Sequence, residues 1–272
     1  MEEKIFNYES SSIYYRVYGE GNPVLLVHGF GEDGSIWKNQ VIELKKKNKL
    51  IIPDIPGSGK SEMIDDMSMS GIAEVMHAII HEEKIDQCIV IGHSMGGYIT
   101  LALVESYWNH VSAFGLFHST AFPDTTEKKA NRRKGIEFVK THGPNEFLKT
   151  TTPNLFSPGT KENNPQLVSD FLDNLPNISG EAIIAYYESM IDRPDRTSIL
   201  INTKNPVLFV AGRHDNAIPF DDVLKQCHLP EKSYFHIFEN SGHMGMLEQH
   251  EYATRILDEF IQQSENQDSL RK

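Results

Sequence analysis

Residues 89–97 have the sequence Ile89-Val90-Ile91-Gly92-His93-Ser94-Met95-Gly96-Gly97, an apolar run that leads into Gly-His-Ser-Met-Gly. A helical pattern follows, so the segment predicts a strand, a sharp turn and a helix in succession. Gly92 and Gly96 leave room for the strand and the helix to approach closely. Such a turn exposes the Ser94 hydroxyl and leaves the Met95 N–H without a helical partner, free to face a developing oxyanion. An ordinary glycine-rich turn fits the same five residues, so the rest of the chain has to separate the two interpretations.

Composition narrows the class of protein and of partner. The chain has 272 residues and a net charge of −12, which argues against nucleic acid or an anionic membrane surface as the main partner. The charged start at residues 1–5 has no apolar signal region, and no apolar run approaches the length of a membrane span. We expect Cys88 and Cys227 to be reduced thiols, the location to be cytoplasmic, and the protein to be a monomer or homodimer that binds a small-molecule substrate.

Strand and helix patterns alternate along most of the chain. Residues 4–18 predict an antiparallel hairpin, after which short apolar runs alternate with longer helical patterns. This alternation indicates an α/β fold with a mostly parallel central sheet and helices on both faces. The predicted strands cover residues 24–27, 50–52, 88–91, 113–117, 207–210 and 234–238, and the predicted helices cover residues 35–47, 68–83, 95–109, 220–227 and 248–262.

The alternation stops between residues 119 and 198. This part has no strand pattern, several amphipathic helical patterns and many prolines. An all-helical insertion between two strands of one sheet predicts a lid over a core domain made of residues 1–118 and 199–272. The helical patterns cover residues 127–140, 145–149, 165–174 and 181–190.

Chemically useful residues follow three other predicted strands, at the sheet edge where open parallel sheets bind ligands. His28-Gly29-Phe30-Gly31 can offer the Phe30 backbone N–H as a second oxyanion donor. Gly212-Arg213-His214-Asp215 places a carboxylate at a strand end, and Ser241-Gly242-His243 places an imidazole in a short loop before a helix. The chain order is serine, acid, histidine, as in nucleophile-elbow hydrolases.

Together with residues 54–61, these segments give the chain a resemblance to the α/β-hydrolase fold superfamily, in its lid-bearing serine esterase-like branch. The resemblance implies Ser94 as nucleophile, His243 as general base and Asp215 as the orienting acid, with Asp124 as the next candidate for the acid. It implies an oxyanion hole made by the backbone N–H groups of Phe30 and Met95, and no metal or organic cofactor. The pocket residues that we expect are His118, Ser119 and Gly29.

The expected reaction is hydrolysis of carboxylic esters with small or medium acyl groups. A serine hydroxyl becomes a good nucleophile when an imidazole takes its proton, and a carboxylate fixes the tautomer of that imidazole. The same three groups could instead cleave a diketone-type C–C bond, a lactone or an amide. A third possibility, from another class, is a member of the fold that mainly binds a ligand or a protein partner.

Three further patterns favour structural explanations. Residues 29–34 fit G-x-G-x-x-G with Asp54 about 20 residues later, but Glu32 and Asp33 would repel a pyrophosphate. Residues 57–61 look like the end of a phosphate-binding loop but lack its first glycine. His77 and His81 have the spacing of a zinc protease without its glutamate.

One charge cluster stays open between two interpretations. It comprises Lys128, Lys129, Arg132, Arg133 and Lys134. A solvated face of a lid helix explains it, and so does a guide for an anionic substrate such as a carboxylate-bearing ester or diketone.

Overall fold

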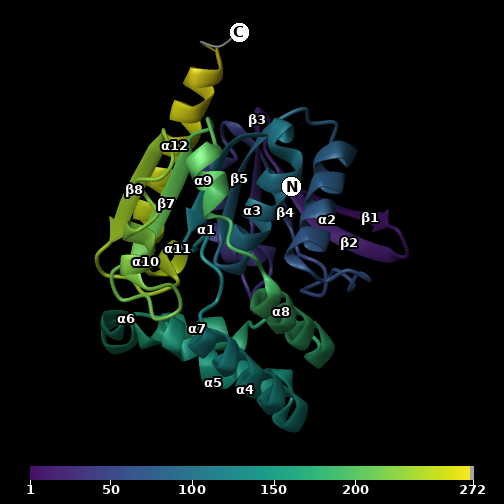
Figure 1. The fold of residues 1–272 in the computed structure, drawn as a ribbon, viewed down its shortest axis with the longest axis vertical. Coiled ribbons are helices and arrows are strands. Elements are labelled where there is room, and N and C mark those ends of the chain that lie inside the picture. Colours follow the sequence, from purple (N-terminus) through teal and green to yellow (C-terminus); the bar gives the residue numbers. More distant parts are fainter. Residues whose placement is uncertain (270–272) are drawn as a thin grey trace.

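Eight strands form one sheet in the computed structural model, which describes residues 1–269. The strand order is β1-β2-β4-β3-β5-β6-β7-β8 (Figure 1). Every apolar run that predicted a strand lies within an observed strand. The bounds are β1 Glu2–Tyr8, β2 Ser11–Tyr18, β3 Asn22–Val27, β4 Asn48–Pro53, β5 Cys88–His93, β6 Val111–Phe117, β7 Val207–Gly212 and β8 Ser233–Phe238.

The sheet is mostly parallel, as the sequence predicted. β1 and β2 form the expected antiparallel hairpin, and β2 also pairs antiparallel with β4. The other neighbouring strands run parallel. Parallel neighbours need long crossover connections, which helices supply here.

Side chains alternate between the two faces of the sheet along each strand. Helices pack on both faces, so both faces are buried. In β3, Leu25 and Val27 pack into one hydrophobic core with residues of α2 and α3, whereas Val24 and Leu26 pack into the other with residues of α1 and α12. The helices outside the β6–β7 connection are η1 Gly34–Trp37, α1 Lys38–Leu44, α2 Met69–Glu82, α3 Met95–Tyr107, η2 Trp108–His110, α10 Phe220–Leu224, α11 Gly245–Glu248 and α12 His250–Ser269.

Some predicted helices differ from the observed ones at their ends. The helix predicted over residues 35–47 starts as the 3-10 turn η1, where the Asp33 carboxylate accepts the Ser35 N–H. The α-helical part that follows ends at Leu44. The helix predicted over residues 248–262 is interrupted at Gln249, whose non-helical backbone (φ −129°, ψ 51°) separates α11 from α12. Hydrophobic periodicity locates such helices well but does not fix their termini.

A helical segment (residues 119–198) connects β6 to β7 and contains no strand. Its helices are α4 Thr126–His142, α5 Pro144–Thr151, η3 Thr152–Leu155, α6 Pro158–Asn163, α7 Pro165–Asp173 and α8 Gly180–Asp192. Proline starts α5, α6 and α7, where a missing N–H costs nothing. In Figure 1 these teal to green helices lie together beyond one end of the sheet. Helix α6 is not among the helices predicted from the sequence. Helix α9 Thr197–Asn202 crosses the boundary expected at residue 198 and packs on α3.

Within residues 1–269, no helix combines the length and hydropathy that a bilayer crossing requires. Cys88 and Cys227 are both free thiols.

Candidate active site

Ser94 occupies the turn between β5 and α3 in a strained conformation, with φ 51° and ψ −117°. Positive φ is uncommon for residues other than glycine and persists only where the surroundings enforce it. A Cβ on Gly92 would lie 2.2 Å from the Gly96 carbonyl oxygen, and a Cβ on Gly96 would lie 2.4 Å from the Val27 carbonyl oxygen. Only glycine therefore allows this close approach of strand and helix. Ser94 itself is partly exposed, while its neighbours His93 and Met95 are buried.

Asp215 and His243 meet at the ends of β7 and β8. His243 Nδ1 lies 2.8 Å from Asp215 Oδ2, and His118 Nδ1 lies 3.2 Å from the same oxygen. The other carboxylate oxygen, Oδ1, accepts the backbone N–H groups of Ala217 and Ile218, each at 2.8 Å. A carboxylate accepts but does not donate, so both histidines carry hydrogen on Nδ1. His243 Nε2 is then the nitrogen available as a base.

The protonation of these groups follows from burial and from their mutual contacts. Burial by itself would raise the pKa of the Asp215 carboxyl, but His243 and His118 outweigh it and hold the pKa below its usual range. Burial lowers the pKa of His118 to about 4 despite its contact with Asp215. Burial also acts to lower the pKa of His243, but Asp215 outweighs burial and raises it. Asp215 is thus an anion flanked by a neutral His118 and a titratable His243.

The loop after β3 passes close to Ser94, since a Cβ on Gly29 would lie 3.0 Å from the Ser94 Cβ. The backbone N–H groups of Phe30 and Met95 donate to no other residue in the described part of the chain. The Gly29 N–H is already used, since it donates to Glu32 Oε2 at 2.7 Å. Gly31 has φ 75°, which turns the chain sharply after Phe30.

Glu32 is a buried acid that was not among the predicted site residues. Its Oε2 lies 2.9 Å from His93 Nδ1, while His93 Nε2 lies 3.0 Å from the His243 carbonyl oxygen. A carbonyl oxygen only accepts, so His93 Nε2 carries hydrogen. Burial acts to raise the pKa of the Glu32 carboxyl, but His93 and the Gly29 N–H outweigh it and lower the pKa. His93 thus lies between the Glu32 carboxylate and the His243 carbonyl oxygen, and it links Glu32 to the loop that carries His243.

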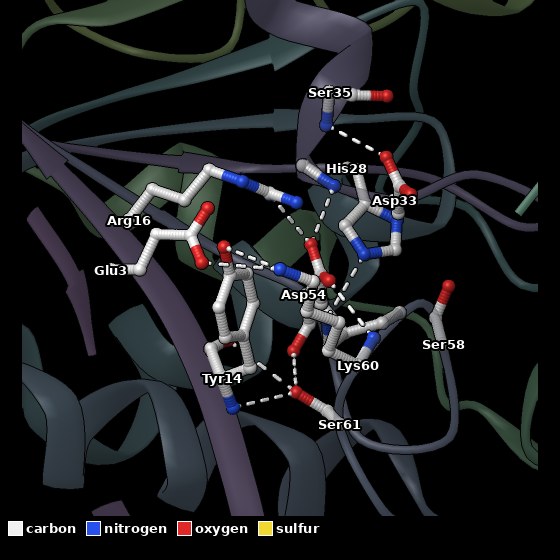
Figure 2. Close-up of polar contacts among 12 residues, drawn as sticks. Glu3, Tyr14, Arg16, His28, Asp33, Ser35, Asp54, Ser58, Lys60 and Ser61 are labelled. Carbon is white, nitrogen blue, oxygen red and sulfur yellow. Dashed lines mark hydrogen bonds and ion pairs between the residues drawn. The ribbon is translucent and has the colours of Figure 1, made fainter. Parts of the chain in front are cut away.

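The turn at residues 57–61 is structural, as the sequence favoured. It wraps around Asp54, whose Oδ1 lies 2.9 Å from an Arg16 guanidinium nitrogen and whose Oδ2 accepts the Lys60 N–H at 3.0 Å (Figure 2). A Cβ on Gly59 would lie 2.3 Å from Asp54 Oδ2. Asp54 is fully buried in these contacts and is not free to bind a ribose.

The residue after Asp54 fixes the start of the loop that carries Phe30. His28 Nε2 accepts the Ile55 N–H at 2.9 Å, and its Nδ1 lies 2.9 Å from the Gly29 carbonyl oxygen. Because an acceptor nitrogen carries no hydrogen, the tautomer of His28 has its hydrogen on Nδ1.

A cavity of about 150 Å³ joins these parts. Residues of the core and of the helical segment line it together: Phe30, Glu32, Ser94, Tyr98, Arg132, Leu148, Thr151, Thr152, Leu155, Tyr187, Met190, Ala217, Ile218 and His243. The structure thus brings Ser94, His243 and Phe30 to one cavity, with Asp215 and Met95 buried behind them.

Three residues expected in the pocket lie behind the cavity wall instead. His118 is fully buried against Asp215, the Ser119 hydroxyl donates to the Ser94 carbonyl oxygen at 2.7 Å, and the Gly29 N–H donates to Glu32. These residues are close to Ser94 in sequence or register, but His118 Nδ1, the Ser119 hydroxyl and the Gly29 N–H are used in supporting contacts.

His118, Asp215 and His243 are also the one cluster in residues 1–269 whose ligand atoms could gather around a metal ion, all within 4.8 Å of one another. We interpret the cluster as a hydrogen-bond network, because the carboxylate accepts four N–H bonds. The histidine pair noted in the sequence is not comparable: His77 stacks on Tyr107 with ring centroids 3.8 Å apart, and His81 is exposed.

Comparison with known families agrees with this arrangement. The sequence profile of the Alpha/beta hydrolase family matches residues 24–255. The chain belongs to the alpha/beta hydrolase family. The match includes the turn at Ser94, Asp215 and His243, and the whole connection between β6 and β7.

Individual relatives within the alpha/beta hydrolase family are distant and are named for different substrates. The chain is 24% identical to a 2-hydroxy-6-oxo-2,4-heptadienoate hydrolase of Pseudomonas putida, over 89% of this chain and 90% of that one. It is 25% identical to a pimeloyl-[acyl-carrier protein] methyl ester esterase of Legionella pneumophila, over 92% and 99%. A solved thermophilic esterase from Thermogutta terrifontis is 28% identical, with a TM-score of 0.89 and coverage of 97% and 99%. These relatives identify the chain as a hydrolase without fixing the bond.

Proposed function

We propose that this protein is a serine hydrolase that cleaves carboxylic esters of small or medium acyl groups through an acyl-enzyme. Ser94 is the nucleophile, His243 the general base and Asp215 the orienting acid. The backbone N–H groups of Phe30 and Met95 form the oxyanion hole. The likeness to two esterases supports the ester as the bond.

One observation carries this proposal. Ser94, held at positive φ in a strand-to-helix turn, lines the same small cavity as His243, whose Nδ1 is fixed 2.8 Å from a buried Asp215 oxygen. An elbow serine, a base with its tautomer set and two unused N–H donors are what acyl transfer requires.

The reaction follows from these positions. Ser94 Oγ attacks the ester carbonyl carbon while its proton passes to His243 Nε2, and the carbonyl oxygen becomes an oxyanion held by two N–H groups. The intermediate collapses, and the alcohol leaves with the proton from His243. Water then attacks the acyl-enzyme with His243 again as base, which releases the acid and restores Ser94.

We propose that the helical segment acts as a lid over this reaction. It supplies about half of the cavity wall, including Arg132, Leu148 and Tyr187. A volume of about 150 Å³ fits a short acyl chain better than a long one. Enclosure also keeps bulk water away from the developing charge, which strengthens the oxyanion contacts.

Labelling with a fluorophosphonate tests the proposal without knowledge of the true substrate. We expect one adduct on Ser94, located by peptide mapping, and none in a Ser94→Ala variant with the same circular dichroism spectrum. Absence of labelling on the folded wild type would contradict an activated serine.

A substrate panel then tests the bond. A C–C hydrolase activity is the second candidate, because one relative is named for a 2-hydroxy-6-oxo dienoate. Short 4-nitrophenyl esters, a lactone, an anilide and a vinylogous 1,5-diketone should be compared by kcat/KM. Fastest turnover of the diketone would replace ester hydrolysis by C–C cleavage with the same three residues.

A further inference from the structure

The basic cluster on α4 divides into two faces in the structure. Lys128 and Arg132 are four residues apart and therefore share one face of the helix. Both are partly buried, Arg132 lines the cavity, and Lys128 Nζ lies 3.1 Å from the carbonyl oxygen of Ala217 on the cavity wall. Arg133 and Lys134 are exposed. A solvated helix face thus explains Arg133 and Lys134, but it does not explain Lys128 and Arg132.

Arg132 belongs to a buried charge group with an excess of positive charge. Its Nε and Nη2 both donate to Asp124, and Arg193 Nη1 lies 2.8 Å from Asp124 Oδ1. The Asp124 carboxylate is fully buried and balances one of these two arginines. This explains why Asp124, the alternative acid suggested by the sequence, is not beside His243.

Arg193 and Arg132 differ in how many of their N–H groups have a hydrogen-bond acceptor. Arg193 also donates to the Met190 and Phe122 carbonyl oxygens and lies over the Tyr98 ring. Arg132 uses two of its five N–H bonds on Asp124, and the described residues provide no acceptor for the other three. The unmatched positive charge therefore lies on Arg132, at the cavity.

The carboxylates around the cavity do not neutralise the positive charge of Arg132. Glu32 is paired with His93, and Asp215 is covered by His118 and His243, whose imidazolium balances it during catalysis. Neither carboxylate contacts Arg132.

The position of Arg132 is fixed by aromatic rings. Its guanidinium carbon lies 5.3 Å from the centre of the Tyr187 ring, and Tyr187 stacks on Phe30 with centroids 4.7 Å apart. This stack connects Arg132 to the residue that carries an oxyanion donor. A preorganised guanidinium loses little freedom when it binds an anion.

We propose that Arg132 binds a carboxylate group of the substrate, so that the preferred substrates are short esters that carry a free carboxylate on the acyl or the alcohol part. This inference rests on the proposed function, because it names the substrate class of the same site. Planar guanidinium groups bind carboxylates through paired N–H bonds, and an anion here would satisfy donors that otherwise face a partly buried cavity.

Matched ester pairs test the inference. One pair is mono-4-nitrophenyl glutarate and its amide analogue 4-nitrophenyl 4-carbamoylbutanoate, with the charge on the acyl part. The other is carboxymethyl butyrate and carbamoylmethyl butyrate, with the charge on the alcohol part. We expect wild type to prefer the charged member of at least one pair by about 10- to 100-fold in kcat/KM, as charge-assisted hydrogen bonds imply.

Arg132→Gln should abolish this preference, while Arg133→Gln, the same charge change on the exposed face, should retain it. Arg132→Gln leaves Asp124 paired with Arg193, so we expect the variant to fold. Equal rates for both members of both pairs, or a preference that survives in Arg132→Gln, would overturn the inference.

A binding measurement separates this inference from the proposed function. Glutarate, but not its uncharged diamide glutaramide, should raise the Tm of wild type and of Arg133→Gln and leave that of Arg132→Gln unchanged. If fluorophosphonate fails to label Ser94 while this shift is present, the anion site stands and the serine mechanism fails. Labelling of Ser94 with no shift and no charge preference refutes the anion site alone.

Discussion

Two histidines share one oxygen of Asp215, and only one of them faces the cavity. His243 and His118 lie 2.8 and 3.2 Å from Oδ2. His118 has φ 49°, an unusual conformation for histidine, which indicates that its surroundings hold it in place. Its N–H spreads the carboxylate charge over two donors and so weakens the pull of Asp215 on the His243 proton.

This sharing predicts the pH dependence. In the proposed mechanism only neutral His243 can accept the Ser94 proton, and Asp215 raises the pKa of His243 above its ordinary 6.5. We expect kcat/KM to rise with pH and to reach half its maximum above pH 6.5. In His118→Leu, Asp215 interacts with His243 alone, so the midpoint should move to higher pH.

His118→Asn is the matched control, because asparagine keeps an N–H donor and tolerates positive φ. Its midpoint should stay near that of wild type. A His118→Leu profile that loses amplitude at an unchanged midpoint would show that His118 only supports the fold.

Glu32 predicts a second pH-dependent effect, on stability. Its pKa is lowered in the folded protein, so its contacts with His93 and the Gly29 N–H stabilise the fold above the unfolded pKa near 4.5, and this stabilisation is lost as pH falls through the folded value. At pH 7, Glu32→Gln should reduce the free energy of unfolding by about 1–3 kcal/mol. The difference from wild type in urea unfolding should shrink at pH 4. The exposed Glu20→Gln variant should differ little at either pH.

At the scale of elements, the β5–α3 turn depends on backbone contact rather than on side-chain packing. A Cβ on Gly92 would lie 2.2 Å from the Gly96 carbonyl oxygen, which cannot move without displacing α3. Gly92→Ala should therefore lower stability by about 1–3 kcal/mol and remove fluorophosphonate labelling. Gly180→Ala is the control, since its Cβ would meet only ordinary contacts at 3.6 and 3.8 Å. Chemical denaturation of both variants checks this, and an unchanged midpoint in Gly92→Ala would contradict it.

The elements also show where sequence patterns stop being informative. Strand cores were predicted well because buried parallel strands are continuous apolar runs between turn residues. The short helix α6 was not predicted, because its six residues have the sequence PGTKEN and bury no side chain, so they carry no hydrophobic periodicity. Helix ends depend on caps such as Asp33 and on interruptions such as Gln249.

For the whole molecule, α8 supplies one of the contacts that hold the helical segment on the core. The Tyr186 hydroxyl donates to the Pro56 carbonyl oxygen, and the next residue, Tyr187, stacks on Phe30. Tyr186→Phe should leave that buried carbonyl unpaired and cost about 1–3 kcal/mol in unfolding free energy. Amide exchange in α8 should become faster while that in α3 is unchanged, as mass spectrometry would measure. Equal acceleration in both helices would mean that the segment does not open by itself.

The sequence by itself determined the order of strands and helices, the turn at Ser94 and the succession of serine, acid and histidine. These are local properties, because apolar runs, glycine sterics and strand-end turns act between residues close in the chain. Only the tertiary structure decided that Asp215 rather than Asp124 lies beside His243, that His118 lies behind the cavity, and that Arg132 faces it. These positions depend on which polar side chains, distant in the sequence, are buried together and must form hydrogen bonds or ion pairs with one another. A local sequence pattern does not contain that information.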